Sequence, residues 1–250
     1  INAADGAPVT VHEETAELIK KGLYYGDLSN GKFDITIGKL SDLWDISTKA
    51  LLDQTDVSMI PSDDEIKKAL TTVDYQNVVV DGNTVTLKGY IADRMKDYLN
   101  QKGAACGYIN LGGNVLCLGA KPDGSSYHIG IQRPFDEEGA AMLAVSVTDQ
   151  TVVSSGVYER YFEVDGKRYH HILDTATGYP YDNGLLGVSI ITDESVDGDG
   201  LSTTCFALGL TDGMALVESL DNTEAVFITE DYELHFSSGM GTKIPYQVME

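Results

Sequence analysis

The chain has 250 residues, enough for one large domain or two smaller ones, and its 42% hydrophobic and 22% charged content is typical of a globular protein. With 17 Lys and Arg against 39 Asp and Glu, the net charge is −22. Such a surface repels nucleic-acid phosphates and anionic lipid, which excludes both as partners held by a basic patch. A phosphate-bearing ligand would need a metal ion or backbone amides to hold it. No apolar run is long enough to cross a membrane.

Three cysteines, Cys106, Cys117 and Cys205, stand among apolar or small neighbours and form no Cys-x-x-Cys pair. An odd number of cysteines gives no disulfide framework, and the absence of clustered Cys and His argues against zinc. We therefore expect buried free thiols. The chain starts at Ile1 without a signal peptide, which indicates that a targeting segment has been removed.

Helical signals dominate the first hundred residues. Thr10 with Glu13, and Ser62 with Glu65, have the spacing of a capping box, in which each side chain bonds the other residue's backbone amide. The predicted helices run over 10–25, 40–53, 62–70 and 88–101. The apolar residues expected along their inner faces include Leu43, Trp44 and Leu51 in the second helix and Ile91, Met95 and Leu99 in the fourth. An Asp-Gly pair flanked by β-branched residues predicts a hairpin over 78–87.

The rest of the chain is dominated by strand signals. Strands are predicted at 108–111, 114–118, 127–131, 142–147, 161–164, 168–173, 186–191, 225–228 and 234–236, with helices over 200–208 and 211–220. Most of these strands come as hairpins and the helices come in separate blocks. This order predicts an α+β fold, with mixed, largely antiparallel sheets and helices packed on them, rather than alternating βαβ units.

Asp199 and Thr203 form the first candidate site. They are four residues apart, so on a helix they share one face. A carboxylate and a hydroxyl suit a hard cation such as Mg²⁺. The alternative is that Asp199 is the N-cap of a helix and holds no ligand.

His170 and His171 form the second candidate site, followed by a segment at 174–178 that resembles an Asx or Ser/Thr turn. On a strand, adjacent histidines face opposite sides, so one of them can enter a site while the other packs or meets solvent. The alternative is that both are structural, since adjacent histidines do not have zinc-ligand spacing.

Two further segments are weaker candidates. Gly112 and Gly113 interrupt apolar strand sequence, which marks either a bulge or a close approach of the backbone to a ligand. Residues 154–162 combine small polar residues with an aromatic and charged group. They fit a ligand-facing loop, and equally a surface loop that enters a strand.

Taken together and in this order, the segments closely resemble the FAD:protein FMN transferase family, the ApbE-like flavin transferases. The resemblance covers nearly all of the chain. The matching blocks are Phe-Asp-Ile-Thr-Ile-Gly (33–38) with Leu-Trp (43–44), Lys-Gly-Tyr-Ile-Ala-Asp (88–93), Ile-Asn-Leu-Gly-Gly-Asn (109–114), Ser-Gly with Tyr-Glu-Arg (155–160), His-His-Ile-Leu-Asp through Thr-Gly-Tyr-Pro (170–180), and Asp-Gly-Leu-Ser-Thr (199–203).

This resemblance implies a T-fold-related α+β domain over 1–250 that lacks the family's N-terminal segment. It also implies an Mg²⁺-dependent transfer of FMN from FAD to a threonine hydroxyl of an acceptor flavoprotein, such as a subunit of a membrane redox pump, with release of AMP. The implied catalytic residues are His171 and Asp199, and the implied metal ligands are Asp199 and Thr203. The nucleotide is expected against Asn2, Phe33, Asp34, Lys88, Asp93, Gly112, Gly113, Ser155, His171 and Thr177.

The sequence departs from the family before the Lys-Gly-Tyr block. In the family, a Gly-rich stretch ends there in an Ala whose carbonyl binds the metal, whereas here Leu87 runs straight into Lys88. The third protein ligand is therefore unassigned. Many family members are lipid-anchored outside the cytoplasmic membrane, so the resemblance also predicts an extracytoplasmic location. Two other readings stay open, an FAD pyrophosphatase that releases FMN and AMP and a non-catalytic FAD-binding protein.

Overall fold

Strand β8 (Leu185–Thr192) is buried at every position and forms the centre of the fold. This computed structural model describes residues 10–52, 54–78, 88–136 and 139–249. In a six-stranded sheet of order β1-β2-β5-β8-β9-β10, β8 lies between β5 (Thr151–Gly156) and β9 (Glu224–Thr229), and every pairing in the sheet is antiparallel. The outer members are β1 (Gly107–Asn110), β2 (Asn114–Leu118) and β10 (Leu234–Phe236).

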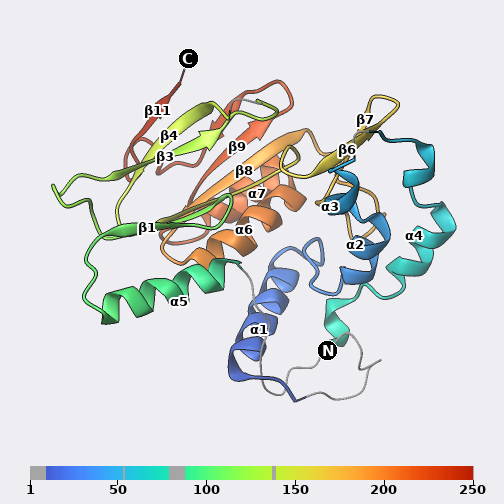
Figure 1. The fold of residues 1–250 in the computed structure, drawn as a ribbon, viewed down its shortest axis with the longest axis horizontal. Helices are drawn as coiled ribbons and strands as arrows, with labels where there is room; N and C mark the ends of the chain where they lie inside the picture. The colour runs from blue at the N-terminus through green and yellow to red at the C-terminus, as the bar shows by residue number, and fades with distance from the viewer. Residues whose placement is uncertain (1–9, 53, 79–87, 137–138, 250) are drawn as a thin grey trace.

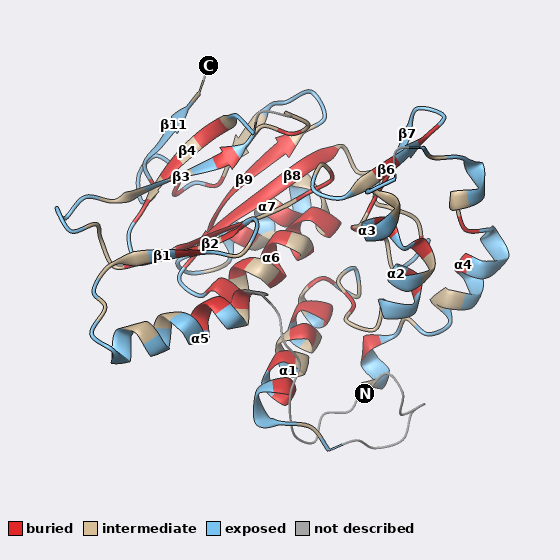
Figure 2. Cartoon of the chain, in the orientation of Figure 1, coloured by how far each residue is buried: buried red, intermediate tan, exposed pale blue. Residues whose placement is uncertain are grey.

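Both faces of this sheet are covered, which explains the continuous burial of β8 (Figures 1 and 2). Helices α6 (Ser195–Leu208) and α7 (Leu210–Glu218) pack on one face, α6 mainly against β5 and β8. On the other side lies a three-stranded antiparallel sheet of β3 (Tyr127–Gln132), β4 (Ala141–Val147) and β11 (Tyr246–Val248), which shares the main hydrophobic core. The predicted α+β architecture is confirmed.

A second, smaller core lies to the right in Figure 1, under the hairpin of β6 (Tyr161–Val164) and β7 (Lys167–His170). Helices α2 (Gly38–Trp44), α3 (Ile46–Lys49) and α4 (Asp63–Leu70) surround it, and the 3₁₀ turns η1 (Val57–Met59) and η2 (Tyr75–Asn77) connect this part. Trp44 is fully buried there, stacks on Tyr169 and donates its indole N–H to the carbonyl of Gly178 at 2.7 Å. The remaining helices are α1 (Glu13–Leu28) and α5 (Lys88–Gln101).

The helix predictions hold in part. The capping box at Ser62 and Glu65 is confirmed, but the predicted box at Thr10 is wrong, because the N-cap of α1 is His12 and makes no side-chain cap bond. The helix predicted over 40–53 breaks at Asp45, which adopts a left-handed conformation, with φ 43° and ψ 42°. Leu51 therefore lies outside any helix and is 83% exposed.

The helix predicted at 88–101 is confirmed, but of its predicted apolar stripe only Leu99 packs inward, where it is partly buried against a small cluster with β1 and β2. Ile91 and Met95 are exposed, whereas Ala92 and Asp93 face inward. The hairpin predicted over 78–87 lies outside the described residues, apart from Val78. The described helices include none with the length and apolar character that a membrane span requires.

Two strands and the start of one helix also differ from the predictions. Residues 151–156 form the strand β5 instead of a loop, α6 begins at Ser195 instead of 200, and β11 was not predicted. β5 was missed because its Ser-Ser-Gly end lacks the alternation of a half-buried strand. The prediction of free thiols is confirmed for all three cysteines, but burial is confirmed only for Cys117 and Cys205, since Cys106 is half-buried.

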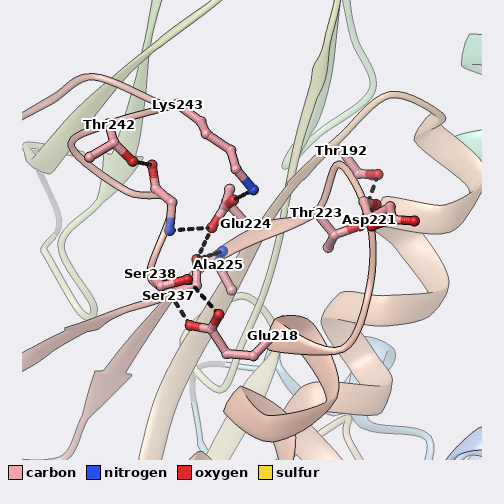
Figure 3. A network of polar contacts seen from close by, with 11 residues as sticks. Thr192, Glu218, Asp221, Thr223, Glu224, Ala225, Ser237, Ser238, Thr242 and Lys243 are labelled. Carbon is pink, nitrogen blue, oxygen red and sulfur yellow. Dashed lines mark hydrogen bonds and ion pairs between the residues drawn. The ribbon is translucent and has the colours of Figure 1, made fainter.

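A buried carboxylate fastens the C-terminal segment to the sheet (Figure 3). Glu224, at the start of β9, accepts bonds from the Ser237 hydroxyl (2.6 Å), the Gly239 amide (3.0 Å) and the Lys243 ammonium (2.9 Å). Glu218 at the end of α7 binds the amide and hydroxyl of Ser238, each at 2.6 Å. These contacts hold the loop that leads from β10 to β11.

Candidate functional site

Asp199 and Thr203 lie one turn apart on α6, as predicted, and in the interior of the helix. The N-cap of α6 is Glu194, so the alternative that Asp199 caps the helix is wrong. The first turn of α5 lies against this part of α6. The Gly89 amide donates to Oδ2 of Asp199 at 3.4 Å, and a Cβ on Gly89 would stand 2.4 Å from the carbonyl oxygen of Ser195. A glycine is required at 89 because any side chain there would separate the two helices.

Strand β5 brings further oxygen atoms to the same face of α6. The Ser155 hydroxyl lies 2.8 Å from the hydroxyl of Ser202 and 3.3 Å from that of Thr203. Ser202 also donates to the carbonyl of Asp199 at 3.2 Å. Ser202 was not singled out from the sequence, although it lies between the two predicted metal ligands.

The Gly112-Gly113 pair forms the turn of the β1–β2 hairpin. The φ angles are 67° and 83°, which fit a type I′ turn, and the Leu111 amide donates to the carbonyl of Asn114 at 2.9 Å. The bulge prediction is wrong, since the turn joins two strands in continuous register. The carbonyl of Gly113 accepts from the Ser154 amide of β5 at 3.0 Å, so the tip of the turn is fixed beside Ser155.

Asp93 lies under the N-terminus of α6. Its two carboxylate oxygens each accept one of the first helical amides, those of Ser195 and Val196, both at 2.8 Å. The side chain is 8% exposed, and its burial raises the pKa to about 6 despite these two bonds. In this structure Asp93 fixes the start of α6, while direct contact with a nucleotide stays a prediction.

The two histidines differ in their surroundings, and the strand predicted through both of them ends at His170. His170 is buried, donates from Nε2 to the carbonyl of Tyr181 at 2.9 Å and meets the ring of Phe206 edge-on. Burial lowers the pKa of His170, so it is neutral at physiological pH. His171 follows the end of β7, with Nδ1 3.3 Å from the carbonyl of Arg160. His171 is half-buried, and its part in catalysis stays a prediction.

Two further predicted residues, Asp34 and Thr177, lie in loops next to α1 and α4. Asp34 is buried and accepts from the amide and hydroxyl of Thr36 and from the Tyr75 amide, so it organises its own loop. Thr177 donates to Asp174 within the turn predicted at 174–178, which is confirmed. Asn2 lies outside the described residues, and the Lys88 side chain is not described.

Phe33 connects this region to α6 through Tyr25. The two rings meet edge-on at 5.8 Å, and the Tyr25 hydroxyl donates to Asp197 at 2.7 Å. Lys21, one turn earlier on α1, also binds Asp197. This contact is not among the features predicted from the sequence. The i, i+4 spacing of Lys21 and Tyr25 was a signal for it, since both lie on one face of α1.

The donor atoms gathered here suit a hard cation. Asp199 offers a carboxylate and Thr203 a hydroxyl, and the hydroxyls of Ser155 and Ser202 are adjacent. Within the described ranges no group of three or more His, Cys, Asp or Glu side chains could hold a metal. A cation at Asp199 and Thr203 would therefore complete its shell with waters or ligand phosphates, which is usual for Mg²⁺.

The chain is similar to proteins of known family. The model of the ApbE family matches residues 1–227. Two curated proteins named FAD:protein FMN transferase, from Klebsiella pneumoniae (strain 342) and Treponema pallidum (strain Nichols), are 36% and 33% identical. The matches cover 95% and 98% of this chain, and 76% and 74% of those proteins.

Solved structures agree with these matches. The ApbE protein of Thermotoga maritima msb8 is 32% identical with a TM-score of 0.77, over 92% of this chain and 77% of that one. The flavin transferase ApbE from Vibrio cholerae has the same TM-score at 26% identity, over 93% and 77% of the two chains. The resemblance inferred from the motifs is confirmed, and the chain belongs to the ApbE family.

Proposed function

We propose that this protein is an FAD:protein FMN transferase that moves the FMN half of FAD to a threonine hydroxyl of an acceptor protein and releases AMP. Its curated relatives carry this name, which makes the chain a transferase. The observation that best supports the proposal is the convergence of three elements on Asp199 and Thr203. These are the first turn of α5, the end of β5 and the Gly112-Gly113 turn that pairs with β5.

The proposed reaction forms one phosphorus–oxygen bond and breaks another. The threonine oxygen attacks the FMN-side phosphorus of FAD, and the bond from this phosphorus to the bridging oxygen breaks, so AMP leaves with that oxygen. Such transfers depend on positioning and charge neutralisation more than on a protein nucleophile. Mg²⁺ bound at Asp199 and Thr203 would supply charge neutralisation at the pyrophosphate, which a chain of net charge −22 otherwise repels.

The acceptor hydroxyl must lose its proton during the attack. We assign this role to His171, because neutral imidazole accepts protons near pH 7 and because the side chain follows the end of β7 instead of packing in the core. His170 is unsuited, since it is buried and its Nε2 already donates to Tyr181.

The products formed from FAD test this proposal. The protein is incubated with FAD, MgCl₂ and a threonine-containing acceptor peptide, and mass spectrometry follows the peptide, FMN and AMP. We expect a peptide with added FMN and an equal amount of AMP. Free FMN with AMP and an unmodified peptide would identify an FAD pyrophosphatase, and unchanged FAD would identify a binding protein. Either outcome contradicts the proposal.

The acceptor and the location are part of the same proposal. We propose an extracytoplasmic enzyme, lipid-anchored or periplasmic, that modifies a flavoprotein subunit of a membrane redox pump. Fractionation of cells that produce the full-length protein tests the location, and recovery in the cytoplasmic fraction contradicts it.

A further inference from the structure

Three hydroxyl groups form a continuous chain where β5 meets α6. Thr203 Oγ1 lies 3.3 Å from Ser155 Oγ, Ser155 Oγ lies 2.8 Å from Ser202 Oγ, and Ser202 Oγ lies 3.2 Å from the carbonyl oxygen of Asp199. We call these three side chains the hydroxyl relay. It begins at one proposed metal ligand and ends on the backbone of the other.

The direction of each bond follows from counting hydrogens. A carbonyl oxygen can only accept, so Ser202 gives its single hydrogen to Asp199. Ser202 must then accept from Ser155, which uses the single hydrogen of Ser155. Ser155 in turn must accept from Thr203. The hydrogen of Thr203 therefore points toward β5, and both of its lone pairs remain to face elsewhere.

This orientation is the one that a metal ligand needs. A neutral threonine hydroxyl binds a cation through a lone pair, and a hydrogen directed at the cation would oppose binding. From this geometry we infer that Ser155 and Ser202 are positioning residues that hold the Thr203 hydroxyl in its metal-binding orientation. The inference rests on the proposed function, which assigns Asp199 and Thr203 to the metal.

Burial supports this role for Ser202. Ser202 is fully buried in a helix, where alanine is intrinsically more favourable than serine, so its hydroxyl is present at a cost in helix propensity. The neighbouring Ser154 makes a separate pair with Ser189 of β8 at 2.7 Å. β5 thus directs one serine to α6 and the next to the adjacent strand, and Ser154 serves as a matched control.

The test measures metal affinity directly as well as activity. Binding of Mn²⁺ is followed by electron paramagnetic resonance, with and without FAD, in the wild type and in Ser155→Ala, Ser202→Ala, Ser155→Thr and Ser154→Ala. Removing residues that orient metal ligands typically weakens metal binding about 10-fold to 100-fold. We expect a loss in that range for Ser155→Ala and for Ser202→Ala. Ser155→Thr should recover the affinity because it keeps the hydroxyl, and Ser154→Ala should bind Mn²⁺ as the wild type does.

The relay also predicts that the losses of metal affinity in the two serine variants do not add, and that the Mg²⁺ dependence of the rate changes more than turnover does. The double variant Ser155→Ala/Ser202→Ala should lose no more Mn²⁺ affinity than the weaker-binding single variant. The reason is that one substitution already interrupts the series of hydrogen bonds. In Ser155→Ala and in Ser202→Ala, the Mg²⁺ concentration that gives the half-maximal rate should rise by a larger factor than turnover at saturating Mg²⁺ falls. Thermal unfolding of each variant shows that it has folded.

Two contrary results have different meanings. If wild-type Mn²⁺ binding does not depend on Asp199, as judged with Asp199→Ala, the metal site of the proposed function is wrong and the relay with it. If binding depends on Asp199 but Ser155→Ala keeps wild-type affinity, or Ser154→Ala loses as much, the relay alone is overturned.

Discussion

Asp199 shows how the position of one residue within a helix decides its interpretation. A carboxylate at the N-cap contributes about 1 kcal/mol to stability, whereas Asp199 lies in the second turn, beyond the orphan amides. Its carboxylate is instead the acceptor of the Gly89 amide, at the contact between α5 and α6. Its removal should therefore affect metal-dependent chemistry far more than folding.

Asp199→Ala should lower Mg²⁺-dependent FMN transfer by orders of magnitude and shift the melting temperature by a few degrees at most. Asp212→Ala is the matched control, because Asp212 is an exposed acidic residue in the first turn of α7. Initial rates from AMP release and melting temperatures from calorimetry check both variants. A near-normal rate in Asp199→Ala would contradict its role as a ligand.

His171→Ala should slow transfer about 10²-fold to 10⁴-fold, the usual contribution of a general base. In the wild type the rate should fall toward acidic pH, because a protonated imidazole cannot accept the proton of the threonine hydroxyl, and the variant should lose this dependence. His170→Ala should keep the rate and lower the melting temperature, since it removes the bond to Tyr181 and a buried ring. The assignment is wrong if His170→Ala is the slower variant in a pH–rate series.

At the scale of elements, the attachment of α5 to α6 shapes the site. Asp93 of α5 binds the first two amides of α6, and Gly89, one turn earlier, contacts the backbone of the same segment. The position of the Asp199 and Thr203 turn relative to α5 thus follows from buried backbone contacts. A substitution at Asp93 should therefore change both the stability of the fold and the position of Asp199 and Thr203 relative to α5.

Asp93→Ala leaves two helix amides without their acceptor and should cost about 2–4 kcal/mol of unfolding free energy. Asp97→Ala, on an exposed turn of α5, should cost little, since its ion pair with Arg94 is solvent-exposed. Both values come from urea denaturation monitored by circular dichroism. An equal, small effect of the two substitutions would show that Asp93 does not hold α6.

The raised pKa of Asp93 predicts the sign of a pH effect. A carboxyl whose pKa is about 6 in the folded state and lower when unfolded binds its proton more tightly in the folded state. Its contribution to stability is therefore fully present below the unfolded pKa of about 4 and is lost as the pH rises through 6. The urea concentration at the unfolding midpoint of the wild type should therefore include a decrease between pH 4.5 and 7.5 that comes from Asp93. The Asp93→Asn variant should lack this decrease.

At the scale of the whole molecule, Glu224 links three parts of the fold, as Figure 3 shows. It joins β9 to the loop that carries Ser237, Gly239 and Lys243, and this loop leads to β11 on the second sheet. Burial raises the pKa of Glu224, but the bonds from Ser237, Lys243 and Gly239 outweigh burial, so the pKa lies below its ordinary value. The stability that Glu224 contributes is therefore fully present above its pKa in the unfolded state. It is lost as the pH falls through its pKa in the folded state.

Glu224→Gln should lower the free energy of unfolding by about 1–3 kcal/mol, because it removes a charged acceptor from three donors. Hydrogen exchange should speed up at the Gly239 amide. Glu233→Gln is the control, since Glu233 is exposed and its nearest ion-pair partner, His235, lies 3.9 Å away. Unchanged exchange in Glu224→Gln would show that the loop is held by other contacts.

The sequence by itself determined the fold class, the family and most of the candidate residues. Sequence patterns correctly predicted features that depend on residues close together in the chain. Examples are the capping box at Ser62, the helix from Lys88 and the turn after Asp174. The order of the motifs along the chain indicated the family, which no single motif could have shown.

Tertiary structure decided what these residues touch. The left-handed Asp45 ends α2 over the Trp44 core. Ile91 and Met95 face outward because α5 turns Asp93 toward α6 and packs Ala92 in a small cluster with β1 and β2. β5 became a central strand because its neighbours supply backbone partners on both edges. The Asp93 bonds and the hydroxyl relay join residues 47 to 103 positions apart. Sequence periodicity describes single elements, so such contacts appear only when the helices and the sheet are packed together.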